Sequence, residues 1–161
     1  MNPRALGAAA ALTALALDQA SKAIVVYGMA MGSREPLVLA PFLNLALRWN
    51  QGISFSLFQQ DTAAGRLILV GFTLVATIFL CVWLWRTSDP LASFAIGAIV
   101  GGAIGNGLDR LMYGAVADFL DLHAFGRNFF VFNVADAAIN LGVGLLLIDA
   151  LFRARTRPSA A

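Results

Sequence analysis

Four long runs of apolar residues dominate the pattern along the chain. The runs cover residues 5–31, 67–85, 91–108 and 134–152. A helix needs roughly 20 mostly apolar residues to cross the hydrocarbon core of a bilayer, and each run has about that length. The run 67–85 contains no charged residue, whereas polar residues interrupt the run 5–31 between Asp18 and Lys22. We therefore predict a membrane protein with four transmembrane helices.

The composition agrees with this prediction. Of the 161 residues, 60% are hydrophobic and only 12% are charged, which is about half the charge of a soluble domain. Too little polar sequence remains for a separate soluble module, so we expect one integral membrane domain over residues 1–161. The net charge of +2 comes from scattered arginines without a basic patch, which argues against nucleic acid as a partner.

The first run also resembles a cleavable signal peptide, because Arg4 precedes its apolar stretch. Three further spans, and the charges of Asp18 and Lys22 directly after that stretch, favour a retained helix. Four spans place both termini on one side of the membrane. Short flanking segments with arginine favour the cytoplasm for that side; these arginines are Arg4, Arg86, Arg153, Arg155 and Arg157. Segments 32–65 and 109–132 then lie outside.

The segment 32–65 has structure of its own in this interpretation. Large apolar residues stand at every second position from Leu43 to Trp49. This alternation predicts a half-buried strand in which the side chains of Leu43 and Trp49 lie on the same face. A turn follows at Asn50-Gln51-Gly52, and residues 53–60 form either a second strand or an interfacial helix. We expect a small β-sheet on the outer membrane surface, between the first two helices.

Charged and polar residues in or beside the spans need a reason, because they are costly in hydrocarbon and often mark function. Asp18 and Lys22 are four residues apart and share a helix face, so they either form an ion pair that fixes helix packing or contact a substrate. Asn50 and Gly52 either form an ordinary turn or position a substrate, since an asparagine amide offers both a donor and an acceptor.

A second polar group follows the glycine-rich end of the third run. Glycines between residues 101 and 105 let another helix approach closely, and Asn106, Asp109 and Arg110 come next. Asp109 and Arg110 are adjacent and point in different directions, so each needs its own partner. A purely structural hydrogen-bond network is the simpler alternative here.

Two more aspartates map to the outer side of the membrane. Asp118 lies in the outer segment among apolar neighbours. The alternative interpretation is that either Asp118 or Asp121 is simply exposed to solvent. Asn133 and Asp136 open the fourth helix, where an aspartate often acts only as a cap. The small side chain of Ala135 leaves room for another group. Asn140 lies one turn deeper than Asp136 on the same helical face.

Asp118 and Asp136 map to the same outer surface, and we expect them to meet there. Two carboxylates that lie close together share one proton near neutrality. One can then deprotonate a water while the other protonates a carbonyl oxygen, which is peptide hydrolysis by general acid–base catalysis. Cys81 and His123 are the only cysteine and histidine, and no HExxH or GxSxG motif is present. We therefore expect no metal and no cofactor.

Five motifs stand in order along the chain and resemble lipoprotein signal peptidase, the bacterial signal peptidase II family. The resemblance covers nearly the whole chain, and Ala117 is a small departure, where a larger aliphatic residue is expected. The motifs are Asp18-Gln19-Ala20-Ser21-Lys22, Asn50-Gln51-Gly52, Gly105-Asn106-Gly107-Leu108-Asp109-Arg110, Gly114-Ala115-Val116-Ala117-Asp118-Phe119 and Phe132-Asn133-Val134-Ala135-Asp136.

The resemblance implies an enzyme of the bacterial inner membrane, surrounded by membrane lipids. Such an enzyme cleaves prolipoproteins just before a cysteine that carries diacylglycerol, and the cyclic peptide globomycin inhibits it. The outer sheet, called a cradle, and an interfacial helix belong to the same picture. Asp118 and Asp136 match the catalytic aspartates. The positions that shape the site or hold substrate match Asp18, Lys22, Asn50, Gly52, Asn106, Asp109, Arg110, Asn133 and Ala135.

Two other classes of function fit parts of the pattern. A small proton-coupled transporter or channel can use Asp18, Lys22 and Asp136 as a relay, but a relay predicts carboxylates spread through the depth of the bilayer. A non-catalytic assembly subunit can bind partner helices through its glycine faces, but it leaves Asp118 and Asp136 unexplained. The clustering at one surface favours the protease.

Overall fold

The computed structural model describes residues 2–52, 63–125 and 127–156, and within them four helices are long and apolar enough to cross a membrane. The helix α1 continues through a π-helical turn, η1 (Ile24–Gly28), and a short 3-10 turn, η2 (Met31–Ser33), follows. The prediction of four spanning helices is confirmed. The helices are α1 (Pro3–Ala23), α2 (Ala63–Arg86), α3 (Pro90–Tyr113) and α4 (Val134–Thr156).

Local sequence fixes where the helices begin and end. The side chain of Asn2 accepts a hydrogen bond from the Arg4 backbone N–H at 3.0 Å, and the Asp89 side chain caps α3 in the same way. A proline follows each of these caps, at the one position where its missing N–H costs nothing. Gly114 ends α3 with φ of +77°, a left-handed conformation that only glycine adopts without strain.

The helix α3 is the centre of the bundle. In its most apolar membrane-spanning stretch 67% of the residues are buried, whereas in that of α2 none are. Two helices approach α3 through glycines: Gly97 and Gly101 lie against the backbone of α1, and Gly102 lies against the backbone of α4 at Ala135. A side chain at these positions would collide with the neighbouring helix, so glycine sets the close spacing around α3.

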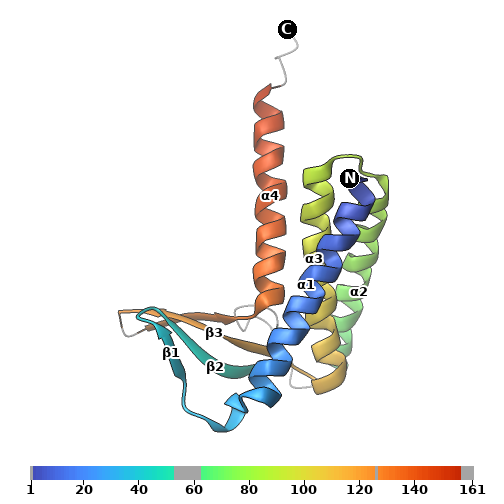
Figure 1. Ribbon diagram of the computed structural model, residues 1–161. Helices are drawn as coiled ribbons and strands as arrows, with labels where there is room; N and C mark the ends of the chain where they lie inside the picture. The colour runs from blue at the N-terminus through green and yellow to red at the C-terminus, as the bar shows by residue number, and fades with distance from the viewer. Residues whose placement is uncertain (1, 53–62, 126, 157–161) are drawn as a thin grey trace.

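A four-stranded antiparallel sheet lies at one end of the helices, away from the start of α1 and the C-terminal end of α4 (Figure 1). The prediction of a small sheet is confirmed, but it does not come only from the segment between α1 and α2. Two strands come from residues 109–132, where no strand was predicted. The predicted interfacial helix at 53–60 lies outside the described residues. In sheet order the strands are β1 (Leu37–Ala40), β2 (Leu43–Asn50), β3 (Val116–Ala124) and β4 (Arg127–Phe132).

A bulge in β2 changes which side chains share a face. Leu45 pairs with Leu120, but Arg48 pairs with Asp118, so two residues of β2 stand opposite one residue of β3. Residues directly opposite each other share a face, and the bulge therefore brings Asn50 to the Asp118 face and turns Trp49 to the other. The predicted common face for Leu43 and Trp49 was wrong, because an inserted residue reverses the alternation beyond it.

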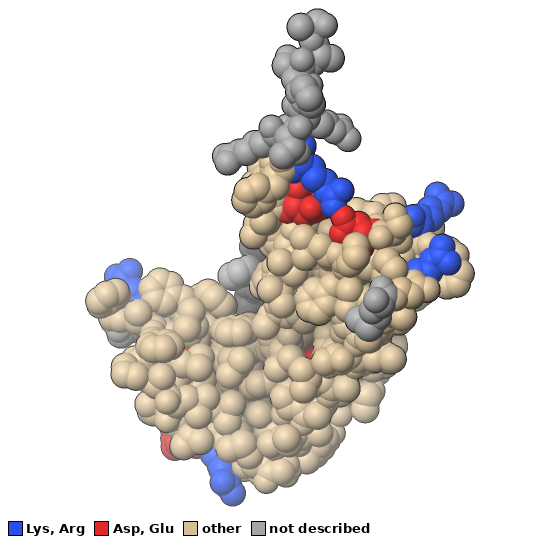
Figure 2. Space-filling model, turned by 45° about the horizontal axis from the view of Figure 1, so that its top comes forward, with Lys and Arg blue, Asp and Glu red and all other residues tan. Residues whose placement is uncertain are grey.

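Charged side chains gather at the helix end away from the sheet, and on the face shown a broad uncharged surface separates them from the few charges near the sheet (Figure 2). At that end the guanidinium of Arg4 lies 4.6 Å from the ring centre of Trp85. Arg153 of α4 forms an ion pair with Asp89, the cap of α3. The uncharged surface between the two ends is what a bilayer requires of the surface it surrounds.

Candidate active site

The site lies where the sheet meets the ends of α1 and α3 and the start of α4, and Asn133 is at its centre. Asn133 is the residue between β4 and α4. Its side-chain Nδ2 donates to Oδ1 of Asp118 at 2.7 Å, and its backbone N–H donates to Oδ2 of Asp136 at 3.3 Å. Two carboxylates from different elements are thus held by one residue.

Asp136 has two separate contacts, one for each carboxylate oxygen. Its Oδ2 accepts from the Asn133 backbone N–H, and in return the Asp136 backbone N–H donates to Oδ1 of Asn133 at 2.9 Å. This arrangement is a capping box at the start of α4. Its Oδ1 faces α3 and accepts from Nδ2 of Asn106 at 2.9 Å. The capping interpretation of Asp136 is correct, but it accounts for only one of the two oxygens.

Asp118 is buried in β3, with only 3% of its surface exposed, so the alternative of a solvated carboxylate is wrong. Its Oδ2 accepts from Nδ2 of Asn50 at 2.9 Å. Burial raises the pKa of Asp118 to about 7, and the charge of Asp136 raises it as well, while the hydrogen bonds from Asn50 and Asn133 oppose the change. Asp118 therefore exchanges its proton near neutral pH.

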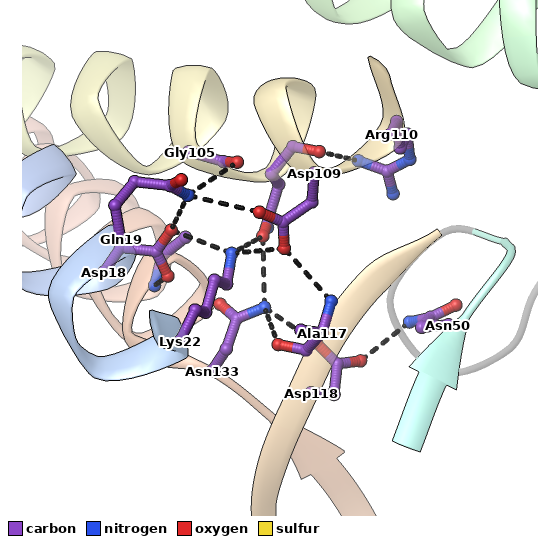
Figure 3. A network of polar contacts seen from close by, with 12 residues as sticks. Asp18, Gln19, Lys22, Asn50, Gly105, Asp109, Arg110, Ala117, Asp118 and Asn133 are labelled. Carbon is purple, nitrogen blue, oxygen red and sulfur yellow. Dashed lines mark hydrogen bonds and ion pairs between the residues drawn. The ribbon is translucent and has the colours of Figure 1, made fainter. Parts of the chain in front are cut away.

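Lys22 is the only cation of a buried cluster beneath this pair, within the described part of the chain. Its Nζ lies 2.8 Å from Oδ2 of Asp18, 2.9 Å from Oδ2 of Asp109 and 3.1 Å from Oδ1 of Asn106 (Figure 3). The predicted ion pair between Asp18 and Lys22 is confirmed. Asn106 uses its oxygen for Lys22 and its nitrogen for Asp136, so one amide connects the buried ammonium to a candidate catalytic carboxylate.

The two aspartates of this cluster also hold the backbone of the elements that carry Asp118 and Asp136. Oδ1 of Asp18 accepts from the Ala135 N–H at 2.9 Å, and this N–H is one of the unpaired donors at the start of α4. Oδ2 of Asp109 accepts from the Ala117 N–H at 3.0 Å, next to Asp118. The cluster thus fixes both candidate catalytic residues through their backbone neighbours.

One contributor, Gln19, was named only as part of a motif and given no role. Its Nε2 lies 3.1 Å from Oδ2 of Asp18 and 3.2 Å from Oδ1 of Asp109. The amide bridges the two carboxylates on the side opposite Lys22, as Figure 3 shows. The available signal was its position inside an apolar run, beside Asp18, where a polar amide needs partners.

The turn after β2 joins the site through Arg110. Oδ1 of Asn50 accepts from the Gly52 N–H at 2.9 Å, so the turn interpretation is correct and Asn50 also contacts Asp118. Nη2 of Arg110 donates to the Gly52 carbonyl at 2.9 Å, and Nη1 donates to the Asn106 carbonyl at 3.2 Å. Asp109 and Arg110 have separate partners, as predicted. The structure brings every sequence-predicted site residue into this one network.

The architecture and the network match a known family. The family model described as signal peptidase (SPase) II matches residues 10–152. The chain belongs to the signal peptidase II family. It is therefore a bacterial multi-pass membrane protease that removes signal peptides, and no finding favours a transporter.

Relatives within this signal peptidase family match almost the whole chain. The lipoprotein signal peptidase of Methylocella silvestris is 49% identical over 155 residues, covering 96% of this chain and 91% of the relative. That of Beijerinckia indica is 48% identical and covers 93% and 90%. A solved structure described as a bacterial membrane enzyme at 2.3 Å has a TM-score of 0.83 and 26% identity, and covers 96% of this chain and 93% of that one. The similarity thus extends over both the helices and the sheet.

Proposed function

We propose that this signal peptidase removes the signal peptide from prolipoproteins, cleaving just before a cysteine that carries diacylglycerol, with Asp118 and Asp136 as the catalytic pair. The observation that carries the proposal is that Asn133 donates to both carboxylates, at 2.7 and 3.3 Å. The name of the relatives, lipoprotein signal peptidase, supports the class of substrate.

The pair acts as an acid and a base that share one proton. Asp136, whose two oxygens accept from Asn106 and Asn133, takes a proton from the attacking water. Asp118, whose pKa of about 7 keeps it partly protonated at neutral pH, gives its proton to the carbonyl oxygen of the scissile bond. The water oxygen bonds to the carbonyl carbon and forms a diol. Asp136 then gives the proton it took to the departing nitrogen as the C–N bond breaks, and a diol hydroxyl returns a proton to Asp118 as the carboxylic acid forms. No metal and no cofactor takes part.

The other network residues position this chemistry. Asn50 and Asn133 hold the Asp118 carboxyl, and Asn106 holds Asp136. Arg110 fixes the turn at Gly52 beside the site. Lys22, with Asp18 and Asp109, holds the ends of α1 and α3 and the backbone at Ala135 in register. Residues 1–161 then work as one integral membrane domain.

The site faces the outer surface of the inner membrane, and both termini lie in the cytoplasm. The arginines in the short segments that flank the spans support this orientation. A cysteine that carries diacylglycerol keeps its lipid among the membrane lipids, which places the scissile bond at the membrane surface, level with the pair. A globomycin-type cyclic peptide would compete with the substrate for this position.

The proposal is tested with purified protein in lipid micelles and a prolipoprotein whose cysteine carries diacylglycerol. We expect cleavage directly before that cysteine, measured by intact mass, and no cleavage of the same prolipoprotein without the lipid. Activity should persist in EDTA. Cleavage elsewhere, equal cleavage of the unmodified protein, or an EDTA-induced loss that zinc restores would each contradict the proposal.

The pH profile tests the assignment of Asp118. Cleavage should fall as pH rises through about 7, because Asp118 then loses its proton. Asn50→Ala removes a hydrogen bond that favours the carboxylate form, so the pKa of Asp118 rises and the alkaline limb of kcat/KM moves up by about one pH unit. Asn44→Ala, in the same strand but on the other face, should leave the limb in place. A limb that moves down in Asn50→Ala contradicts the assignment.

A further inference from the structure

Asn140 is a polar residue in the membrane-spanning part of α4 that the network above does not use. It lies six residues after Val134, about 9 Å along the helix from its start. Its side chain is exposed, and it makes no hydrogen bond to any other described residue. Because Asn140 follows Asp136 by four residues, the two side chains lie on the same face of α4, one turn apart.

An amide in this position needs a partner that the described chain does not supply. An unpaired polar group in hydrocarbon costs several kcal/mol, because no water is there to bind it. The stripe that continues from Asp136 and Asn140 is apolar: Val143 and Leu147 are 42% and 60% exposed. A molecule that lies against this face of α4, directly below Asp136, would supply the partner that the described residues lack.

A substrate signal segment has such groups to offer, and this step rests on the proposed function. The last four carbonyls of any helix lack an intrahelical partner. A signal helix must end before the scissile bond, so that the bond is extended and reaches the carboxylates. Asn140 lies about 6 Å deeper than Asp136 along α4, which equals about two residues of extended chain.

We propose that Asn140 is a substrate-binding residue that donates from its amide to a backbone carbonyl of the signal segment, about two residues before the scissile bond. It satisfies an orphan carbonyl within the hydrocarbon and sets the register of the segment against Asp118 and Asp136. A second copy of the chain is the competing occupant, because asparagine also joins helices across membrane interfaces.

Asn140→Leu tests this assignment in the cleavage assay. We expect KM to rise about tenfold with kcat nearly unchanged, because the lost hydrogen bond is present in the ground state and the transition state alike. The matched variant is N140L/L141N, which keeps the composition and turns the amide by about 100° around the helix. It should remain impaired. An unchanged KM in Asn140→Leu, or full activity in the swapped variant, would overturn the proposal.

Ester-containing substrates locate the bond and separate the two occupants. Replacing one backbone amide by an ester weakens its carbonyl as an acceptor, and we would place the ester at each of the first four positions before the scissile bond. At one position the ester should raise KM for the wild type but not for Asn140→Leu. Equal effects on both enzymes, or loss of a dimer in the variant by light scattering, would overturn the assignment. Failure of the proposed function would look different, because the wild type itself would then not cleave.

Discussion

Asp118→Asn and Asp136→Asn should each lower the cleavage rate by about 10²–10⁴-fold, the usual contribution of a positioned acid or base. Each substitution keeps the shape of the side chain, removes its ability to exchange a proton, and replaces one oxygen by an NH2 group that cannot accept a hydrogen bond from Asn50, Asn133 or Asn106. Both carboxylates contact Asn133, so removing either one leaves the shared proton without its second site. The measurement is single-turnover cleavage of the lipid-modified prolipoprotein, with folding checked by thermal unfolding in detergent.

Asparagine is the right replacement at position 136 because it separates catalysis from capping. Its side-chain oxygen still accepts the Asn133 N–H, so the capping box of α4 survives. If Asp136 served only as a cap, Asp136→Asn would keep near wild-type activity, and the dyad would be wrong. Asp149→Asn is the matched control, since Asp149 pairs with Arg153 at the far end of α4. This variant should cleave the substrate at the normal rate.

The helices follow from the sequence because membrane spans depend on one quantity, the length of an apolar run. The runs predicted at 67–85, 91–108 and 134–152 became helices at 63–86, 90–113 and 134–156. The residues that extend the helices beyond the predicted runs are not marked by hydropathy alone, since they include both Arg110 and Leu111, and caps such as Asp89 and Gly114 decide where the helices begin and end. Hydropathy carries no information about helix caps, so the existence of the spans can be predicted from the sequence more accurately than the residues at which they begin and end.

The sheet was only half predictable, for reasons visible in two strands. In β3 the residues from Val116 to Phe119 are all buried, so the alternation that marks a half-buried strand is absent. Asp118 and Asp121 then look like loop residues. In β2 the bulge between Leu45 and Arg48 has no sequence mark, yet it is what carries Asn50 to the Asp118 face.

The members of the site were predictable, but their connections were not. Polar residues within membrane spans stand out in the sequence because their transfer into hydrocarbon costs free energy, and Asp18 and Lys22 were recognised for this reason. Nothing local shows that Asp18 reaches the Ala135 N–H, 117 residues along the chain. Such contacts depend on how the helices pack around α3, and glycines such as Gly105, which leaves room only for the Asp18 carboxylate, set that packing.

Lys22→Met should have the largest effect on stability, lowering the free energy of unfolding by about 3–5 kcal/mol. Asp18 and Asp109 are 0% and 1% exposed, and Lys22 is the one cation that contacts both in the described chain. Removing it leaves two buried carboxylates without a counter-charge, with only hydrogen bonds from neutral groups to stabilise them, whereas methionine fills nearly the same volume. We would measure thermal unfolding in detergent and expect the variant also to lose cleavage activity, because Asn106 loses the ammonium that orients it.

Two comparisons show that the cost is electrostatic and depends on burial. Arg153 and Asp149 form another ion pair at 2.8 Å with the same four-residue spacing, but these side chains are 59% and 22% exposed, against 6% and 0% for Lys22 and Asp18. Arg153→Met should therefore cost less than about 1 kcal/mol. The triple variant D18N/K22M/D109N removes all three charges and should recover much of the stability that Lys22→Met loses. If the triple variant were less stable than Lys22→Met, the carboxylates would be stabilised by contacts other than the ammonium, and the electrostatic explanation would fail.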